Sequence, residues 1–111
     1  MFRVRSVAEE LEAHLVDPAG TGRAAGKAER KRYGTGEERL KLRASGVAAP
    51  DGAHVDVRLD GDLIARAEFH GGRVALVLES PGVHVPAVRA GQVLALALAD
   101  TIVLSGTFRA E

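Results

Sequence analysis

Apolar and polar residues alternate with a period of two through residues 53–79. The alternation runs in three stretches, 55–59, 63–69 and 74–78, separated by Asp60-Gly61 and by His70-Gly71-Gly72. A period of two is typical of strands with one buried face, and Asp-Gly or Gly-Gly between such strands is typical of tight hairpin turns. This segment therefore predicts a meander of three antiparallel strands, with its inward Val, Leu and Phe residues in the core.

The same alternation recurs on both sides of this segment. Clean examples are residues 39–44, 92–99 and 101–108. The residues expected to face the core there are Leu40, Leu42, Ala44, Leu94, Leu96, Leu98, Ile102, Leu104 and Phe108. About eight short strands with frequent turns are typical of an all-β sandwich or barrel. We predict a single antiparallel β-sandwich over residues 8–111, in meander or Greek-key order, with residues 1–7 as an N-terminal arm or edge strand.

Two stretches near the N-terminus are less regular. In residues 7–16, Ala8, Leu11 and Leu15 fit the stripe of a helix, whereas Leu11, Ala13 and Leu15 fit one face of a strand. Glu, Ala and Leu favour a helix by propensity. Every later segment is sheet-like, however, and we predict a strand. Residues 24–33 combine small and charged side chains, which is typical of a sheet edge protected from stray pairing.

The connection formed by residues 80–91 is long and contains two prolines and two glycines. We expect it to cross between sheets, with Val83, Val85 and Val88 covering one end of the core. The core should be thin and aliphatic, because the only aromatic residues are Phe2, Tyr33, Phe69 and Phe108.

The outward faces of the late strands are unusually apolar. The residues concerned are Ala75, Val77, Ala95, Ala97 and Val103, with Val93 beside them. Strands buried on both faces have such near-continuous apolar runs. Small alanines on a solvent face are also common, because more than half of a protein surface is apolar. The first interpretation predicts self-association through a sheet face or an edge strand, and the expected partner is then a second copy or another protein.

Composition limits the function further. At 111 residues the chain fits one domain, and it contains no cysteine. Its net formal charge is zero, which argues against a dedicated polyanion binder but not against a local basic patch. No apolar run is long enough for a membrane span. The N-terminus has no apolar secretion signal, so we expect a cytoplasmic protein unless a signal has been removed.

The order of motifs resembles the CHRD domain, the repeat named from chordin. The first hairpin of that family is rich in Gly and Ala, as in residues 20–28, and a strand ending in Ser-Gly follows, as in Leu40 to Gly46. The closing pair of strands is similar to residues 90–98 and 102–108. The resemblance implies an antiparallel β-sandwich, often extracytoplasmic, and it carries over no active site. The histidine-bearing motif of the family is missing or reduced to His54.

Basic residues gather in two adjacent predicted strands. They are Lys27, Arg30, Lys31, Arg32, Arg39, Lys41 and Arg43. If the strands pair, one face could bind an anionic polymer, either nucleic acid or an acidic glycan. Alternatively, Glu10, Glu12, Glu29, Glu37 and Glu38 neutralise these cations by cross-strand pairing.

Candidates for other chemistry are weak. His54 and Asp56 share a strand face with His70 nearby, which permits a metal site, but the histidines lack tight ligand spacing. The serines lack a nucleophile motif, and Asp56, Asp60 and Asp62 surround a hairpin rather than a cleft. We therefore predict no catalytic residues and no cofactor. The first hypothesis is a non-enzymatic, self-associating interaction module; a polyanion-binding module is the second, and a metal-binding protein is the weakest.

Overall fold

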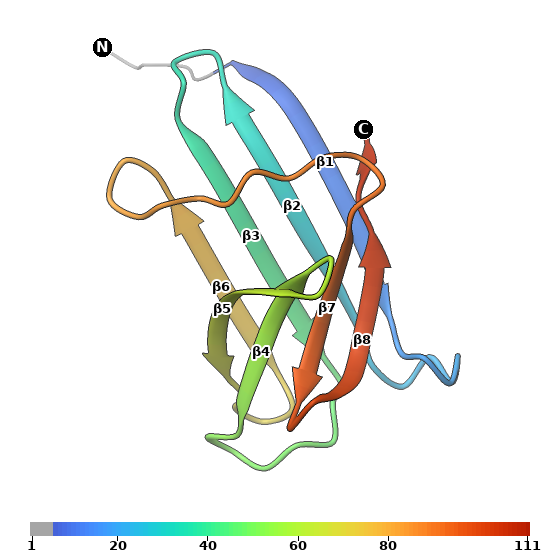
Figure 1. Cartoon of the computed structure of the whole chain (residues 1–111). Helices are drawn as coiled ribbons and strands as arrows, with labels where there is room; N and C mark the ends of the chain where they lie inside the picture. The colour runs from blue at the N-terminus through green and yellow to red at the C-terminus, as the bar shows by residue number, and fades with distance from the viewer. Residues whose placement is uncertain (1–5) are drawn as a thin grey trace.

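The computed structural model describes residues 6–111, which are all-β and contain no helix. Residues 1–5, most of the predicted arm, lie outside the described residues. The strands are antiparallel and wrap around one core (Figure 1). Their bounds are β1 (Val7–Val16), β2 (Ala25–Tyr33), β3 (Glu38–Ser45), β4 (His54–Leu59), β5 (Asp62–Glu68), β6 (Val74–Glu79), β7 (Val93–Leu98), β8 (Thr101–Thr107) and β9 (Arg109–Ala110).

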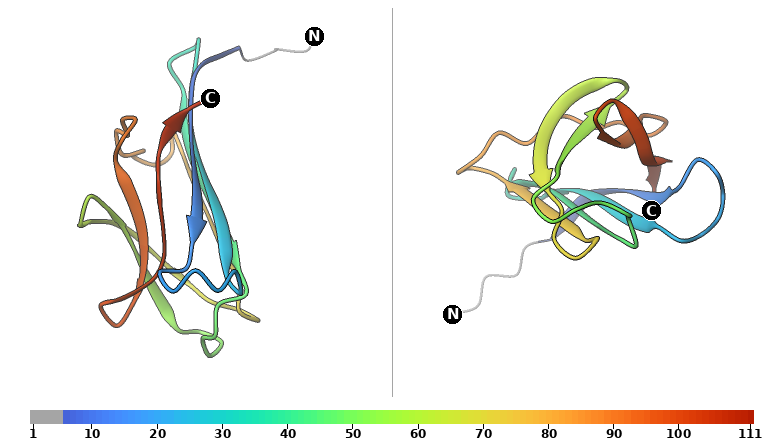
Figure 2. Two further views of the ribbon diagram at one scale, coloured as in Figure 1. Left: turned by 90° about the vertical axis from the view of Figure 1, so that its right-hand side faces the viewer. Right: turned by 90° about the horizontal axis from the view of Figure 1, so that it is seen from below.

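The strands form one sheet in the order β5-β4-β7-β8-β1-β2-β3-β6, and β9 pairs with β1. The sheet curls until it is nearly closed, as the end-on view in Figure 2 shows. Its weakest point inside the sheet is β1–β8, where the only paired residues are Val16 and Ser105. Its two edges are β5 and β6, which follow each other in the chain but do not pair. An antiparallel, all-β fold was predicted correctly.

The ambiguous first segment is a strand, as predicted. Leu11, Ala13 and Leu15 are 5%, 0% and 1% exposed, which is the alternation of a strand with one buried face. β1 pairs with β2 along its whole length. This pairing overrides the local preference of Glu, Ala and Leu for a helix.

The predicted three-stranded meander is wrong in its second half. β4 and β5 form the expected hairpin, with Asp60 and Gly61 both at positive φ. β6, however, pairs with β3. Just before the turn, Phe69 is fully buried and its N–H donates to the Ala53 carbonyl. The following turn then carries the chain across to the other half of the sheet.

β2 is not a sheet edge, contrary to the prediction. It lies between β1 and β3, with regular pairing on both sides. Its inward face carries Ala28, which is 0% exposed. Its outward charges pair with acidic residues, so small and charged residues suit a central strand with one solvent face.

Two predicted core residues, Leu63 and Ile102, are instead 51% and 46% exposed. Each lies beside a register shift. Val57 pairs with Ala65 and Arg58 pairs with Leu63, so Ile64 has no partner on β4 and is an extra residue in β5. Likewise, Leu96 pairs with Leu104 and Ala97 pairs with Ile102, so Val103 is an extra residue in β8. One extra residue reverses which side chains face the core.

The core lies between the two halves of the curled sheet. Its largest fully buried side chains are Phe69, Phe108, Leu15, Leu40, Leu42, Leu94, Leu96, Leu104, Val55 and Val57. Val85 and Val88 of the long connection cover one end of it, as expected. Val83 does not, because it is 49% exposed.

Candidate anion-binding face

The outer face of β1, β2, β3 and β6 carries charges in a graded order. The pairing register aligns three rows across these four strands. The rows are Glu10, Lys31, Arg39 and Glu79; Glu12, Glu29, Lys41 and Val77; and His14, Lys27, Arg43 and Ala75. Acidic residues thus dominate β1, both signs alternate on β2, and β3 presents only cations.

The charges on β1 and β2 neutralise each other. Lys27 Nζ lies 3.1 Å from a carboxylate oxygen of Glu12 and 3.1 Å from one of Glu29. These contacts raise the pKa of Lys27, with the hydrogen bond to Glu29 as the largest cause, and lower the pKa of Glu29. Lys31 Nζ lies 3.7 Å from carboxylate oxygens of both Glu10 and Glu29. Lys27 and Lys31 therefore contribute little net positive charge.

The cations on β3 differ. Within residues 6–111, Arg39, Lys41 and Arg43 form no ion pair. They stand at alternate positions of one strand, so their Cα atoms are about 7 Å apart. We call these three residues the basic strip. It borders β6, which places the uncharged Val77 and Ala75 opposite Lys41 and Arg43, and Glu79 opposite Arg39.

A cleft of 730 Å³ opens at the Arg43 end of the basic strip. Arg43, Arg73 and Lys27 line it together with His70, and Glu68 is the one acidic residue among its lining. Its floor is made by small residues, including Gly26, where an added Cβ would lie 2.7 Å from the Arg43 carbonyl oxygen. Because β2 and β3 approach closely here, a side chain at position 26 would clash with β3.

Arg73 was not among the predicted basic residues. It reaches the cleft because the turn after Phe69 delivers β6 to β3, where Ala44 pairs with Val74. No pattern in the sequence predicts this contact, since Arg73 follows Gly71-Gly72, a pair typical of a hairpin turn.

Two of the seven predicted cations do not join this face. Arg30 points inward, as the strand alternation between Lys27 and Lys31 requires. It is 7% exposed, donates from Nε to the Pro86 carbonyl at 3.0 Å, and pairs with Glu38 at 3.2 Å. Arg32, two residues further along β2, lies on the same side as Arg30 and pairs with Glu9 at 3.7 Å.

The residues predicted for self-association are not on one face. Ala75 and Val77 are exposed on β6, and Val103 is half-buried on β8, far along the sheet order. Ala95 and Ala97 on β7 are 8% and 1% exposed, so they offer almost no surface to a partner. The five residues therefore do not form one exposed apolar surface, and self-association remains a prediction.

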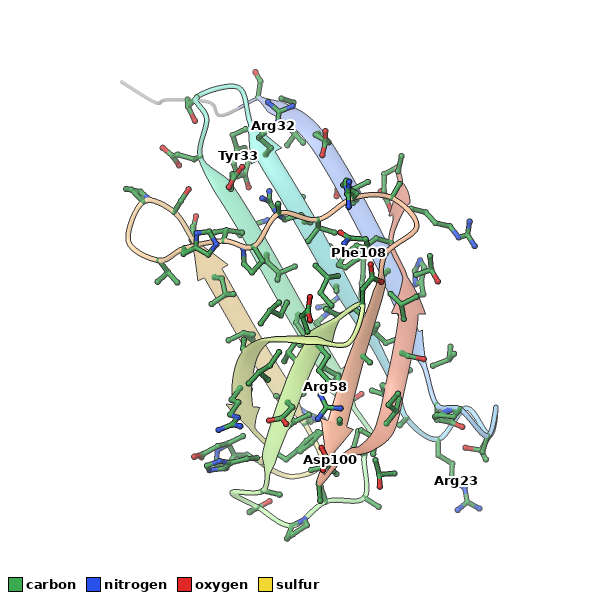
Figure 3. The ribbon with its side chains drawn as sticks, viewed as in Figure 1. Arg23, Arg32, Tyr33, Arg58, Asp100 and Phe108 are labelled. Carbon is green, nitrogen blue, oxygen red and sulfur yellow. The ribbon has the colours of Figure 1, made fainter. Side chains whose placement is uncertain are left out.

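Longer side chains on the neighbouring strand explain the burial of these alanines. Arg58 of β4 stands opposite Ala95, and Asp56 stands opposite Ala97. The Arg58 guanidinium reaches Asp100 in the β7–β8 turn at 2.8 Å, and Figure 3 shows the two side chains pointing toward one another. Arg58 therefore extends along β7 above its small residues.

The residues suggested for a metal site are separated. His54 and His70 flank Glu68, at 3.3 and 3.6 Å from its carboxylate. Asp56 instead binds Arg66 at 3.0 Å and Arg58 at 3.5 Å. In the described part of the chain, Glu10 and Glu12 of β1 and the exposed Glu111 bring carboxylate oxygens within 4.8 Å of one another. The pKa of Glu111 is raised, with its hydrogen bond to Glu12 as the largest cause.

The chain matches no protein-family model and no curated protein. Its resemblance to the CHRD domain therefore stays a prediction. The described residues include no helix that could span a membrane.

Proposed function

We propose that this protein is a non-enzymatic binding module that holds an anionic polymer on the basic strip and the adjoining cleft. The observation that carries the proposal is the contrast between neighbouring strands. The cations of β2 are neutralised by glutamates, whereas Arg39, Lys41 and Arg43 form no ion pair among the described residues. A ligand with regularly spaced negative charges would supply the missing partners.

The arrangement of the cations favours a chain over a small anion. The strip is linear, and Arg73 adds a further cation beyond Arg43 in the cleft. Each cation that neutralises a ligand charge also releases a condensed counterion, so several together give appreciable affinity even when each contact is weak. A protein of zero net charge can bind in this way because its opposite charges are segregated.

The surroundings of the strip favour an acidic glycan over nucleic acid. Single-stranded nucleic acids bind by stacking their bases on aromatic side chains. Tyr33, Phe69 and Phe108, the aromatic residues in the described part of the chain, are 6%, 0% and 0% exposed. A sulfated or uronic-acid polysaccharide needs no such platform.

The test is binding of heparin, polygalacturonate and single-stranded DNA, measured by calorimetry at several salt concentrations. The variant Arg39→Gln/Lys41→Gln/Arg43→Gln is expected to lose at least tenfold in affinity for the acidic glycans. The slope of log K against log salt concentration should also become less steep by about 2 to 3, because three ion contacts are lost. Tighter binding of DNA than of both glycans would overturn the choice of glycan.

A matched control keeps the net charge change the same. Arg23, Arg89 and Arg109 are exposed cations on other parts of the molecule. The triple variant Arg23→Gln/Arg89→Gln/Arg109→Gln should bind nearly as the parent does. Equal losses in the two triple variants, or binding that ignores salt, would refute the proposal.

The finer fold class is part of the proposal. The halves β5-β4-β7-β8 and β1-β2-β3-β6 are joined by one β8–β1 residue pair and by the short β9. Such a weak junction supports a β-sandwich over a closed barrel. That the sandwich is of the CHRD type remains a proposal from the sequence.

A further inference from the structure

We infer that β6 is a pairing edge that joins two copies of this chain through an antiparallel β6–β6 contact centred on Val77. The inference does not rest on the proposed polymer binding. It begins with the topology: β5 and β6 are the ends of the sheet, and within the described residues no strand pairs with the free side of either.

The two edges differ in how they are protected. Sheet edges are normally guarded by charges, prolines or bulges. β5 has such guards, namely Arg66 within the strand and the register shift that leaves Ile64 over. β6 has none between Val74 and Leu78, and it pairs with β3 without any register shift. Val77 at its middle is 51% exposed. Between Val74 and Leu78, β6 is therefore a regular, apolar and unguarded edge, whereas at its end the Glu79 carbonyl accepts a hydrogen bond from the Val83 N–H at 3.1 Å.

Backbone geometry shows which groups of β6 a partner strand would meet. The Ser80 N–H donates to the Glu38 carbonyl of β3 at 3.0 Å. Hydrogen-bonding direction alternates along a strand, so residues 78, 76 and 74 also bond toward β3. The N–H and C=O groups of Ala75 and Val77 then point to the free side. These are donors and acceptors that only another strand can satisfy in register.

The face alternation restricts the pairing of two copies. Residues directly opposite in an antiparallel pair point to the same side of the sheet. Pairing Val77 with Val77 of the second copy meets this condition and places Ala75 opposite Glu79 of that copy. Leu76 and Leu78 then face each other on the inner side. Arg43, which neighbours Ala75 across β3–β6, comes within side-chain reach of the second copy's Glu79.

A second copy is favoured over an unrelated strand for two reasons. The contact is self-complementary in charge, with Arg43 and Glu79 contributed twice by symmetry. The chain has a formal net charge of zero, so two copies do not repel each other as whole molecules. The dimer would also align two basic strips on one continuous face, about 14 Å apart across the two β6 strands.

The first experiment is sedimentation equilibrium of the full chain without any polymer, up to millimolar concentration. The parent is expected to dimerise. Val77→Lys should weaken the dimer at least tenfold, because the two introduced ammonium groups would stand opposite each other. The matched control is Leu63→Lys on β5, since Leu63 is also 51% exposed; it should dimerise as the parent does. A monomeric parent, or equal losses in both variants, would overturn the inference.

The second experiment tests the register. The chain has no cysteine, so Val77→Cys introduces a single thiol per copy. A hydrogen-bonded pair has a Cα separation of about 5.5 Å, which a disulfide can bridge. Mild oxidation should give a cross-linked dimer with Val77→Cys, and far less with Leu63→Cys. Equal cross-linking of the two variants would show random collision and would contradict the Val77-centred contact.

Discussion

Gly106 of β8 lies directly against the backbone carbonyl of His14 in β1. A Cβ added at Gly106 would overlap that carbonyl oxygen and approach its carbon to 2.8 Å. The contact lies at the junction between the two halves of the sheet, next to the single Val16–Ser105 pair. The junction is thus held by a close backbone approach that only glycine allows.

Gly106→Ala should therefore destabilise the fold. The obstacle is rigid backbone, so the strands must separate, and overpacking of this kind costs about 1–3 kcal/mol. Urea unfolding followed by circular dichroism measures the change. Gly82→Ala is the control, because its nearest atom would lie 4.0 Å away and φ is not positive. An unchanged midpoint for Gly106→Ala would show that the junction is adaptable.

Phe69 should be the costliest single truncation in the turn between β5 and β6. It is 0% exposed and its backbone bonds to Ala53 and Gly52. Phe69→Ala should lower the free energy of unfolding by about 3–5 kcal/mol. Ile102→Ala should change it far less, because Ile102 is 46% exposed. The alternation alone would assign both residues to the core, so similar losses would mean that the β8 bulge is wrongly placed.

The limits of the sequence are clear at these bulges. Period-two patterning correctly predicted the strands and most of the core, because one buried face leaves a strong signal. Ile64 and Val103 each add one residue to a strand, and an insertion of one residue leaves no mark when its neighbours are also apolar. Leu63 and Ile102 were misassigned for this reason.

Strand order was beyond the sequence for a different reason. His70 and Arg73 exchange two hydrogen bonds across Gly71-Gly72, so the predicted tight turn forms. Beyond it β5 and β6 do not pair, and β6 pairs with β3, which the local turn signal does not determine. The basic strip could be predicted from β3 alone, because its three cations alternate with Leu40 and Leu42. The position of Arg73 in the cleft could not be predicted, because it depends on the pairing of β6 with β3. The alternation of β2 implies that Arg30 faces inward. However, β2 contains few apolar residues, so its sequence does not show which face is buried.

The turn after β1 should make stability depend on pH. The Asp17 carboxylate accepts hydrogen bonds from the Thr21 N–H at 3.0 Å, the Thr21 hydroxyl at 2.9 Å and the Gly22 N–H at 3.0 Å. These bonds, with the Thr21 N–H as the largest cause, lower the pKa of Asp17 below its ordinary value. A lowered pKa in the folded state means that the contribution is complete above the unfolded pKa and is lost as the pH falls through the folded pKa.

Asp17→Ala should accordingly lower Tm at neutral pH, and the difference from the parent should shrink as the solution is acidified toward pH values below about 4. Thermal unfolding at a series of pH values measures this. Asp62→Ala removes the same charge from an exposed position and controls for net charge. A Tm difference that grows on acidification would contradict the assigned hydrogen bonds.

Arg30 and Arg43 should separate stability from binding. Arg30 is buried and bonds to Pro86 and Glu38, so Arg30→Met should destabilise the fold by about 1–3 kcal/mol through lost charge-assisted hydrogen bonds. It should leave glycan affinity nearly unchanged, because its guanidinium lies on the inner side of β2. Arg43→Met should lower the affinity for glycan and leave the free energy of unfolding nearly unchanged. Arg43 is exposed and forms no ion pair among residues 6–111. Urea unfolding and calorimetric titration with heparin, run on both variants, measure the two effects. A loss of heparin affinity in Arg30→Met at a temperature where it is fully folded would place the binding surface on the other side of the sheet.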